Sequence, residues 1–133
     1  MRIETKKVEL NKAPEVIFEF LSDFRNFENL MPGDKIEKWT ATPDTCSFVI
    51  NGMANIGMKI QETFPPSEIR IVSFGKNPFD FKLTVYIDSA GPERSIAYLL
   101  FEADVNPFLQ MMAEKPLSNF FNMLSSKLQE IYR

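Results

Sequence analysis

Apolar residues recur at every second position through the middle of the chain, from Asp34 to Val105, and turn-forming residues separate the runs. This period of two predicts β-strands with one buried face and one solvent-facing face. Only short turns join the runs, whereas parallel strands would need long crossover segments, so we expect an antiparallel meander. The inward-facing residues of the main runs are Phe48 and Ile50, then Ile56, Met58 and Ile60, then Ile69 and Ile71, then Phe79, Phe81, Leu83, Val85 and Ile87, and finally Leu99, Phe101, Ala103 and Val105.

One long helical segment, Asn106 to Arg133, follows these strands. Asn106 is suited to cap the helix, and Pro107 is suited to its first turn. Pro116 removes a backbone donor inside the helix, so we expect a kink near Lys115. Apolar residues with helical spacing predict one buried face, made of Leu117, Phe120, Phe121, Leu124, Leu128 and Ile131.

Before the strands, the chain predicts an opening strand over residues 2 to 10 and then two short helices. Pro14 starts the first helix, whose apolar stripe runs from Val16 to Phe24. The second carries Phe27 and Leu30 and stops at Met31-Pro32-Gly33. Together these elements predict an α+β fold.

The 133 residues suit a single domain, 1–133. The longest apolar run, Ile96 to Phe101, is too short to cross a bilayer, so we expect no transmembrane segment. The amino-terminal residues are charged where a signal peptide needs an apolar segment, and Cys46 is the only cysteine. Both features favour a cytoplasmic protein.

Several kinds of chemistry are disfavoured by composition. The chain contains no histidine, which excludes Ser-His and Cys-His nucleophilic systems and His-containing metal sites. Its five glycines form no phosphate-binding loop, and no DxD or ExxE cluster supports a carboxylate metal site. The net charge is −3 with acids and bases interleaved, which disfavours nucleic-acid binding. We therefore expect no metal, cofactor or nucleic-acid partner.

The element order resembles the helix-grip fold of the START-like superfamily, which includes steroid and lipid transfer domains, birch-pollen-allergen-like proteins and bacterial polyketide cyclase/dehydrase-type proteins. The segment Ala13-Pro14-Glu15-Val16-Ile17-Phe18, with Leu21, Asp23 and Met31-Pro32, carries the resemblance, and Asn106-Pro107-Phe108 and Pro116-Leu117 are similar to bacterial members. One departure is Leu30, where many bacterial members have Trp. The resemblance implies a curved antiparallel sheet of about six or seven strands around the C-terminal helix, with two short helices after the first strand.

The resemblance also implies an apolar cavity between the sheet and the long helix. The chain has 13 Phe and 7 Met, which supply bulk without a strong hydrogen-bonding group and suit a permissive pocket. On the helix, we expect the stretch before Pro116 to border the cavity and the later stripe to be ordinary core. The expected lining is Phe48, Ile50, Met58, Ile60, Ile71, Leu83, Val85, Leu99, Phe101, Phe108, Met111, Met112, Phe120 and Phe121.

Three functions remain open at this point. The first is noncatalytic binding or carrying of a small hydrophobic ligand, lipid-like or aromatic, and the absence of a catalytic constellation favours it. The second is a polyketide cyclase or dehydratase-type enzyme that uses Glu62 and Asn51. Glu62 shares strand parity with Met58 and Ile60, although it could instead pair with Arg70 in solvent. The third is a protein-interaction module, and an oligomer is possible.

Overall fold

The computed structural model describes residues 1–50 and 54–133. Within these residues the chain forms eight strands, two α-helices and one 3-10 helix. Their order is β1 (Arg2–Glu4), β2 (Val8–Leu10), α1 (Pro14–Leu21), η1 (Phe24–Leu30), β3 (Ile36–Ala41), β4 (Thr45–Ile50), β5 (Ala54–Phe64), β6 (Glu68–Ser73), β7 (Phe81–Gly91), β8 (Arg94–Ala103) and α2 (Pro107–Tyr132).

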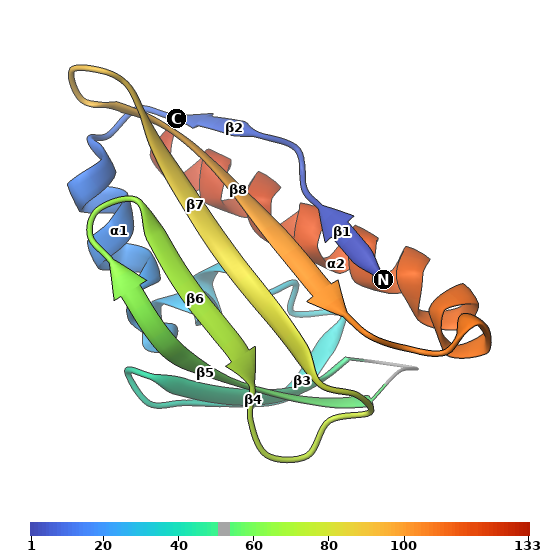
Figure 1. Ribbon diagram of the computed structural model, residues 1–133. Helices are drawn as coiled ribbons and strands as arrows, with labels where there is room; N and C mark the ends of the chain where they lie inside the picture. Colours follow the sequence, from blue (N-terminus) through green and yellow to red (C-terminus); the bar gives the residue numbers. More distant parts are fainter. Residues whose placement is uncertain (51–53) are drawn as a thin grey trace.

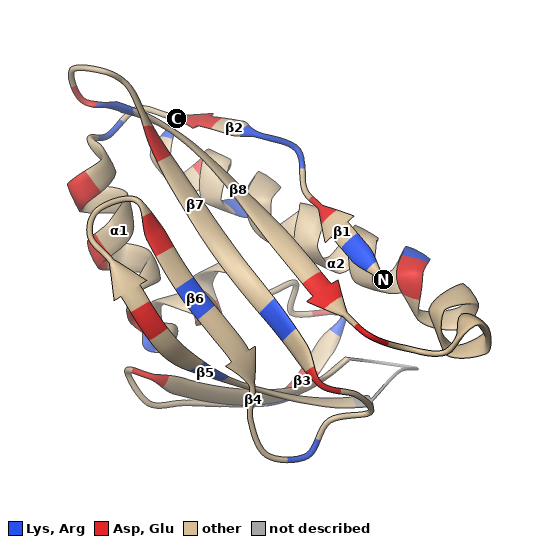
Figure 2. Cartoon of the chain, in the orientation of Figure 1, with Lys and Arg blue, Asp and Glu red and all other residues tan. Residues whose placement is uncertain are grey.

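The strands form one antiparallel sheet in the order β1-β8-β7-β6-β5-β4-β3, and β2 also pairs with β8. The sheet curves around α2, which lies against its concave face, and α1 lies at one end (Figure 1). This arrangement confirms the expected α+β helix-grip fold. On the face that points away from α2, acidic and basic residues are interspersed (Figure 2), so this face does not present a continuous basic surface.

The expected opening strand is split into β1 and β2, which raises the strand number from the expected six or seven to eight. The break falls at Thr5, which is buried. The Thr5 backbone N–H donates to the Leu99 carbonyl, and the Thr5 hydroxyl accepts a hydrogen bond from the Leu99 N–H at 2.9 Å. The Ser125 hydroxyl of α2 lies 3.3 Å from the same Thr5 oxygen. The Thr5 side chain therefore accepts the hydrogen bond from β8 at the point where the backbone pairing of the opening strand is interrupted.

The two short helices are confirmed, and the second of them is a 3-10 helix. Pro14 occupies the first turn of α1, as its fixed φ favours. The Asp23 carboxylate accepts a hydrogen bond from the Arg25 N–H and so caps η1. Both helices bury apolar side chains against the sheet and α2, among them Ile17, Leu21, Phe24, Phe27 and Leu30.

The long helix α2 begins at the expected cap, where the Asn106 side chain accepts a hydrogen bond from the Leu109 N–H at 2.8 Å. It continues through Pro116 to Tyr132. Most of the expected stripe is buried, but Ile131 is 41% exposed because it lies in the last turn. No helix in the described part of the chain is long and apolar enough to span a membrane.

Aromatic rings fill much of the space between α2 and the sheet. Phe120 of α2 stacks on Phe48 of β4 with ring centroids 5.6 Å apart, and it contacts Phe121 at 5.5 Å. Phe121 in turn lies 5.0 Å from Phe101, which lies 5.2 Å from Phe81. A continuous chain of rings therefore joins β4 to β7 and β8 through α2.

Candidate functional site

Most of the predicted lining residues face the interior between the sheet and α2. Ile60 and Leu99 are half-buried, and nine others are between 0% and 7% exposed. Strand parity and helix spacing thus predicted correctly that these side chains turn inward. That these residues contact a ligand stays a prediction. The nine are Phe48, Ile50, Met58, Ile71, Leu83, Val85, Phe101, Phe120 and Phe121.

Among the described residues, side chains fill most of the space between the sheet and α2. A small pocket beneath α2 has a volume of about 20 Å³, which is roughly the space that one water molecule needs. In this conformation aromatic rings and aliphatic side chains therefore occupy most of the space where the apolar cavity was expected. The walls of the small pocket are Val8, Leu21, Phe27, Leu30, Val85, Ala97, Tyr98, Leu99, Leu124, Ser125 and Leu128.

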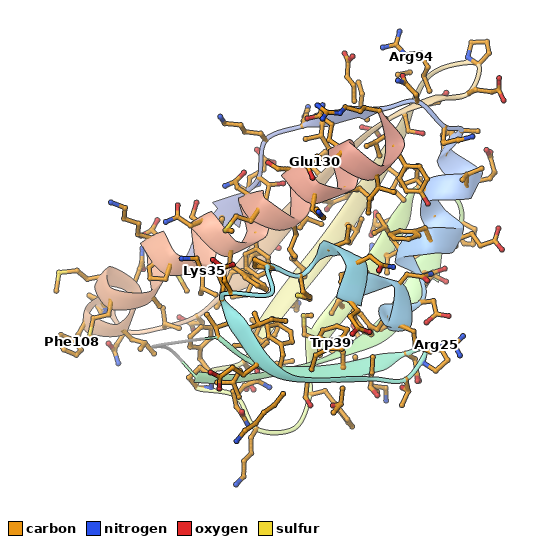
Figure 3. The ribbon with its side chains drawn as sticks, turned by 180° about the vertical axis from the view of Figure 1, so that it is seen from behind. Arg25, Lys35, Trp39, Arg94, Phe108 and Glu130 are labelled. Carbon is orange, nitrogen blue, oxygen red and sulfur yellow. The ribbon has the colours of Figure 1, made fainter. Side chains whose placement is uncertain are left out.

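The prediction that the first turns of α2 border the interior is wrong. Phe108, Met111 and Met112 are 68%, 74% and 61% exposed. These turns extend past the end of β8, and Figure 3 shows Phe108 at the outer tip of the molecule. Ala113 is the first residue of the helix that is buried. The three side chains therefore face solvent instead of bordering the interior.

Glu62, the predicted catalytic carboxylate, lies outside the interior. The pairing of β5 with β6 shifts register between Ile60 and Glu62. The alternation of inward and outward side chains that begins at Met58 is therefore interrupted before Glu62. The Glu62 side chain is 55% exposed, and its Oε1 lies 3.5 Å from Nη1 of Arg70. Glu62 is therefore not placed to act as a general base in the interior, as the enzyme hypothesis requires. Asn51, the other residue of that hypothesis, lies outside the described residues.

Beside α2 the surface is hollowed along the turn that joins η1 to β3. One depression of about 820 Å³ has walls from residues 30–35 and from the C-terminal half of α2. A second depression, of about 330 Å³, shares Lys35, Asn119 and Met123 with the first. We call the two together the α2 groove. Its residues are Leu30, Met31, Pro32, Gly33, Lys35, Ile50, Lys115, Pro116, Asn119, Phe120, Asn122, Met123, Ser126, Lys127 and Glu130.

The groove follows from the way η1 ends. The Met31 N–H donates to the carbonyls of Phe27 and Glu28, and Met31 itself is extended, so the helix stops there. Pro32 accepts a hydrogen bond from the Lys35 N–H at 2.8 Å, which closes a turn that carries the chain to β3. In Figure 3 Lys35 lies beside the middle of α2, with Glu130 nearer the C-terminal end of the helix.

The floor of the groove belongs to the protein core. Ile50 and Phe120 are 7% and 4% exposed, and Phe120 is the ring that stacks on Phe48. Met123, which is 39% exposed, lines the same depression. The groove therefore has an apolar floor and a rim of amides and lysines, an arrangement suited to a small amphipathic molecule.

Other reactive groups are few in the described part of the chain. Burial raises the pKa of the Cys46 thiol to about 12, so this thiol stays protonated at neutral pH and is a poor nucleophile. The described Cys, Asp and Glu residues form no group of three or more that could hold a metal ion.

Comparison with solved structures identifies the fold. A START superfamily protein from Mycobacterium smegmatis matches with a TM-score of 0.68 and 15% identity over 98% of each chain. Truncated norcoclaurine synthase from Thalictrum flavum matches with a TM-score of 0.76 and 13% identity, over 98% of this chain and 92% of that one. The same enzyme in complex with dopamine and hydroxybenzaldehyde matches at 0.73 and 13%, over 98% and 85%. The chain therefore has the START-like helix-grip fold that the sequence resemblance implied.

Neither a protein-family model nor a curated protein matches the sequence.

The groove itself was not predicted from the sequence. Met31, Pro32 and Gly33 indicated only the end of a helix, and Asn119 and Met123 lie beside the predicted buried stripe of α2. The spacing of Met123 from Phe120 does place it next to that stripe, where a half-exposed apolar residue indicates the edge of a contact.

Proposed function

We propose that this protein binds a small apolar or amphipathic molecule in the α2 groove, without catalysing a reaction. The observation that carries this proposal is the apolar floor of Ile50 and Phe120, two core residues at the base of an open groove. The two depressions, at about 820 and 330 Å³, are of a size typical of ligand sites. The exposed position of Glu62 supports binding over catalysis.

In this proposal the ligand displaces Met123 and lies against Phe120. Methionine is unbranched and flexible, so it can move aside at small cost. Burying about 200 Å² of apolar ligand surface would contribute about 5 kcal/mol before the entropy cost of association. Because about 5 kcal/mol corresponds to a dissociation constant of about 0.2 mM, we expect simple apolar probes to bind with dissociation constants of about 0.2 mM or above.

In this proposal, some of the predicted interior lining residues lie behind the floor of the groove. Phe48, Phe101 and Phe121 form the next layer beyond Phe120. A larger ligand would reach them only if Phe120 changed its rotamer. Support for small-molecule binding on this fold comes from the norcoclaurine synthase that is in complex with dopamine and hydroxybenzaldehyde.

We propose a cytoplasmic location for this binder. Cys46, its one cysteine, is a buried free thiol, which supports a reducing compartment.

An acidic side chain at the apolar floor of the groove is expected to weaken the binding of a neutral probe. Met123→Glu places a carboxylate over the apolar floor, so its affinity for 1-decanol, measured by calorimetry, should fall at least about tenfold. Met111→Glu is the matched control, because Met111 is 74% exposed and lies outside the groove. It should bind 1-decanol as the unaltered protein does.

Unchanged affinity in Met123→Glu, or an equal loss in Met111→Glu, would show that the probe binds elsewhere. Native mass spectrometry of gently purified protein complements this test by identifying any molecule that co-purifies.

A further inference from the structure

We infer that the molecule bound in the α2 groove carries an anionic head group, of the carboxylate class, that lies against Lys35. This inference rests on the proposed function, because it describes the ligand of the same groove. The ligand class is therefore a single-chain or aromatic carboxylic acid, with its apolar part on the floor of the groove.

Lys35 is placed where the two depressions meet. It lines both of them, together with Asn119 and Met123, and its side chain is exposed. No ion pair within the described residues joins its ammonium group to a carboxylate. The neighbouring acid, Asp34, is not among the residues that line either depression. Lys35 is thus a cation at the centre of the groove that is free to pair with a ligand.

The charge of the groove differs in sign from that of the whole protein. Among the described residues that line it are three lysines, Lys35, Lys115 and Lys127, and one acid, Glu130. Lys127 is already paired, because its Nζ lies 3.5 Å from Oε2 of Glu130. Lys35 and Lys115 therefore leave the groove cationic in a chain whose net charge is −3. A cationic groove on an acidic protein selects for an anion.

The polar and apolar groups of the groove are arranged in the order that an amphipathic acid needs. The apolar residues Ile50, Pro116 and Phe120 line the second depression, which Lys115 also borders. Lys35 and Asn119 lie at its junction with the first, where the Asn119 amide can donate a hydrogen bond to a carboxylate. A carboxylate at Lys35 would thus leave the ligand's chain on the Phe120 floor.

Two probes of equal chain length test this inference, namely decanoate and 1-decanol, each titrated as a monomer at low salt by calorimetry. The expected result is that decanoate binds about three- to tenfold more tightly, the range of an exposed charge-assisted contact. In Lys35→Gln the ratio of the two affinities should fall to about one. Raising the salt concentration should reduce the ratio in the unaltered protein, because exposed charges are screened.

Lys82→Gln is the matched control. Lys82 is exposed on β7 between the buried residues Phe81 and Leu83, so it lies on the sheet face opposite α2, and the ratio should stay as in the unaltered protein. Equal affinities for the two probes in the unaltered protein would overturn the anionic head group while leaving the proposed function intact. Failure of both probes to bind would overturn both. A ratio unchanged in Lys35→Gln would overturn the assignment to Lys35.

Discussion

Replacing Phe101 by Ala is expected to lower the free energy of unfolding by about 4 kcal/mol, the loss typical of removing a buried aromatic ring. Phe101 is 2% exposed and lies at the centre of the aromatic chain. Its ring centroid is 5.0 Å from that of Phe121, 5.2 Å from that of Phe81 and 6.3 Å from that of Phe79. Removing the ring would leave a cavity that three neighbouring rings cannot close.

Urea denaturation of Phe101→Ala measures this loss directly. Phe108→Ala is the matched control, because Phe108 is 68% exposed and its removal should change the free energy of unfolding by less than about 0.5 kcal/mol. A loss below about 1 kcal/mol for Phe101→Ala would contradict a tightly filled interior.

Replacing Leu83 by Trp is expected to destabilise the fold by about 3 kcal/mol, at the upper end of the usual cost of overpacking a core. The presence of an open cavity would lead to the opposite expectation, since the larger ring would then occupy empty space. Leu83 is 0% exposed on β7, between its register partners Ile71 of β6 and Phe101 of β8. Leu83 does not line the small pocket beneath α2, so the indole would have to displace its neighbours.

Thermal unfolding distinguishes the two expectations. We expect the Tm of Leu83→Trp to fall by about 10 °C. Lys82→Trp introduces the same ring one position earlier on the exposed face of β7 and should leave the Tm nearly unchanged. If Leu83→Trp were as stable as the unaltered protein, the interior would contain room for a ligand.

The fold was predictable because its signals are local. The alternation from Phe81 to Ile87 reports which face of one strand is buried, and it does not depend on where the partner strands lie. Pro14, Asn106 and Pro107 likewise act within one helical turn. These signals are sufficient for the order of the elements and for the inward faces that Leu83, Val85 and Phe120 present.

The site was less predictable because it depends on distances between elements. Helical spacing shows which face of α2 is apolar, but only the packed structure shows that the helix first meets the sheet at Ala113, beyond Met112. The alternation of apolar residues along β5 could not reveal the irregular pairing with β6 between Ile60 and Glu62. The groove itself depends on the separation between the turn near Lys35 and α2, which no local pattern encodes.

The central claim is that a small amphipathic molecule binds in the α2 groove, and methionine-methyl NMR during a titration with decanoate tests it most directly. Met31 and Met123 line the groove, whereas Met58 is buried in the core and Met111 and Met112 are exposed outside the groove. We expect the methyl signals of Met31 and Met123 to shift in a saturable way while those of Met111 and Met112 stay in place. Saturable shifts at Met111 and Met112, with Met31 and Met123 unchanged, would contradict the claim.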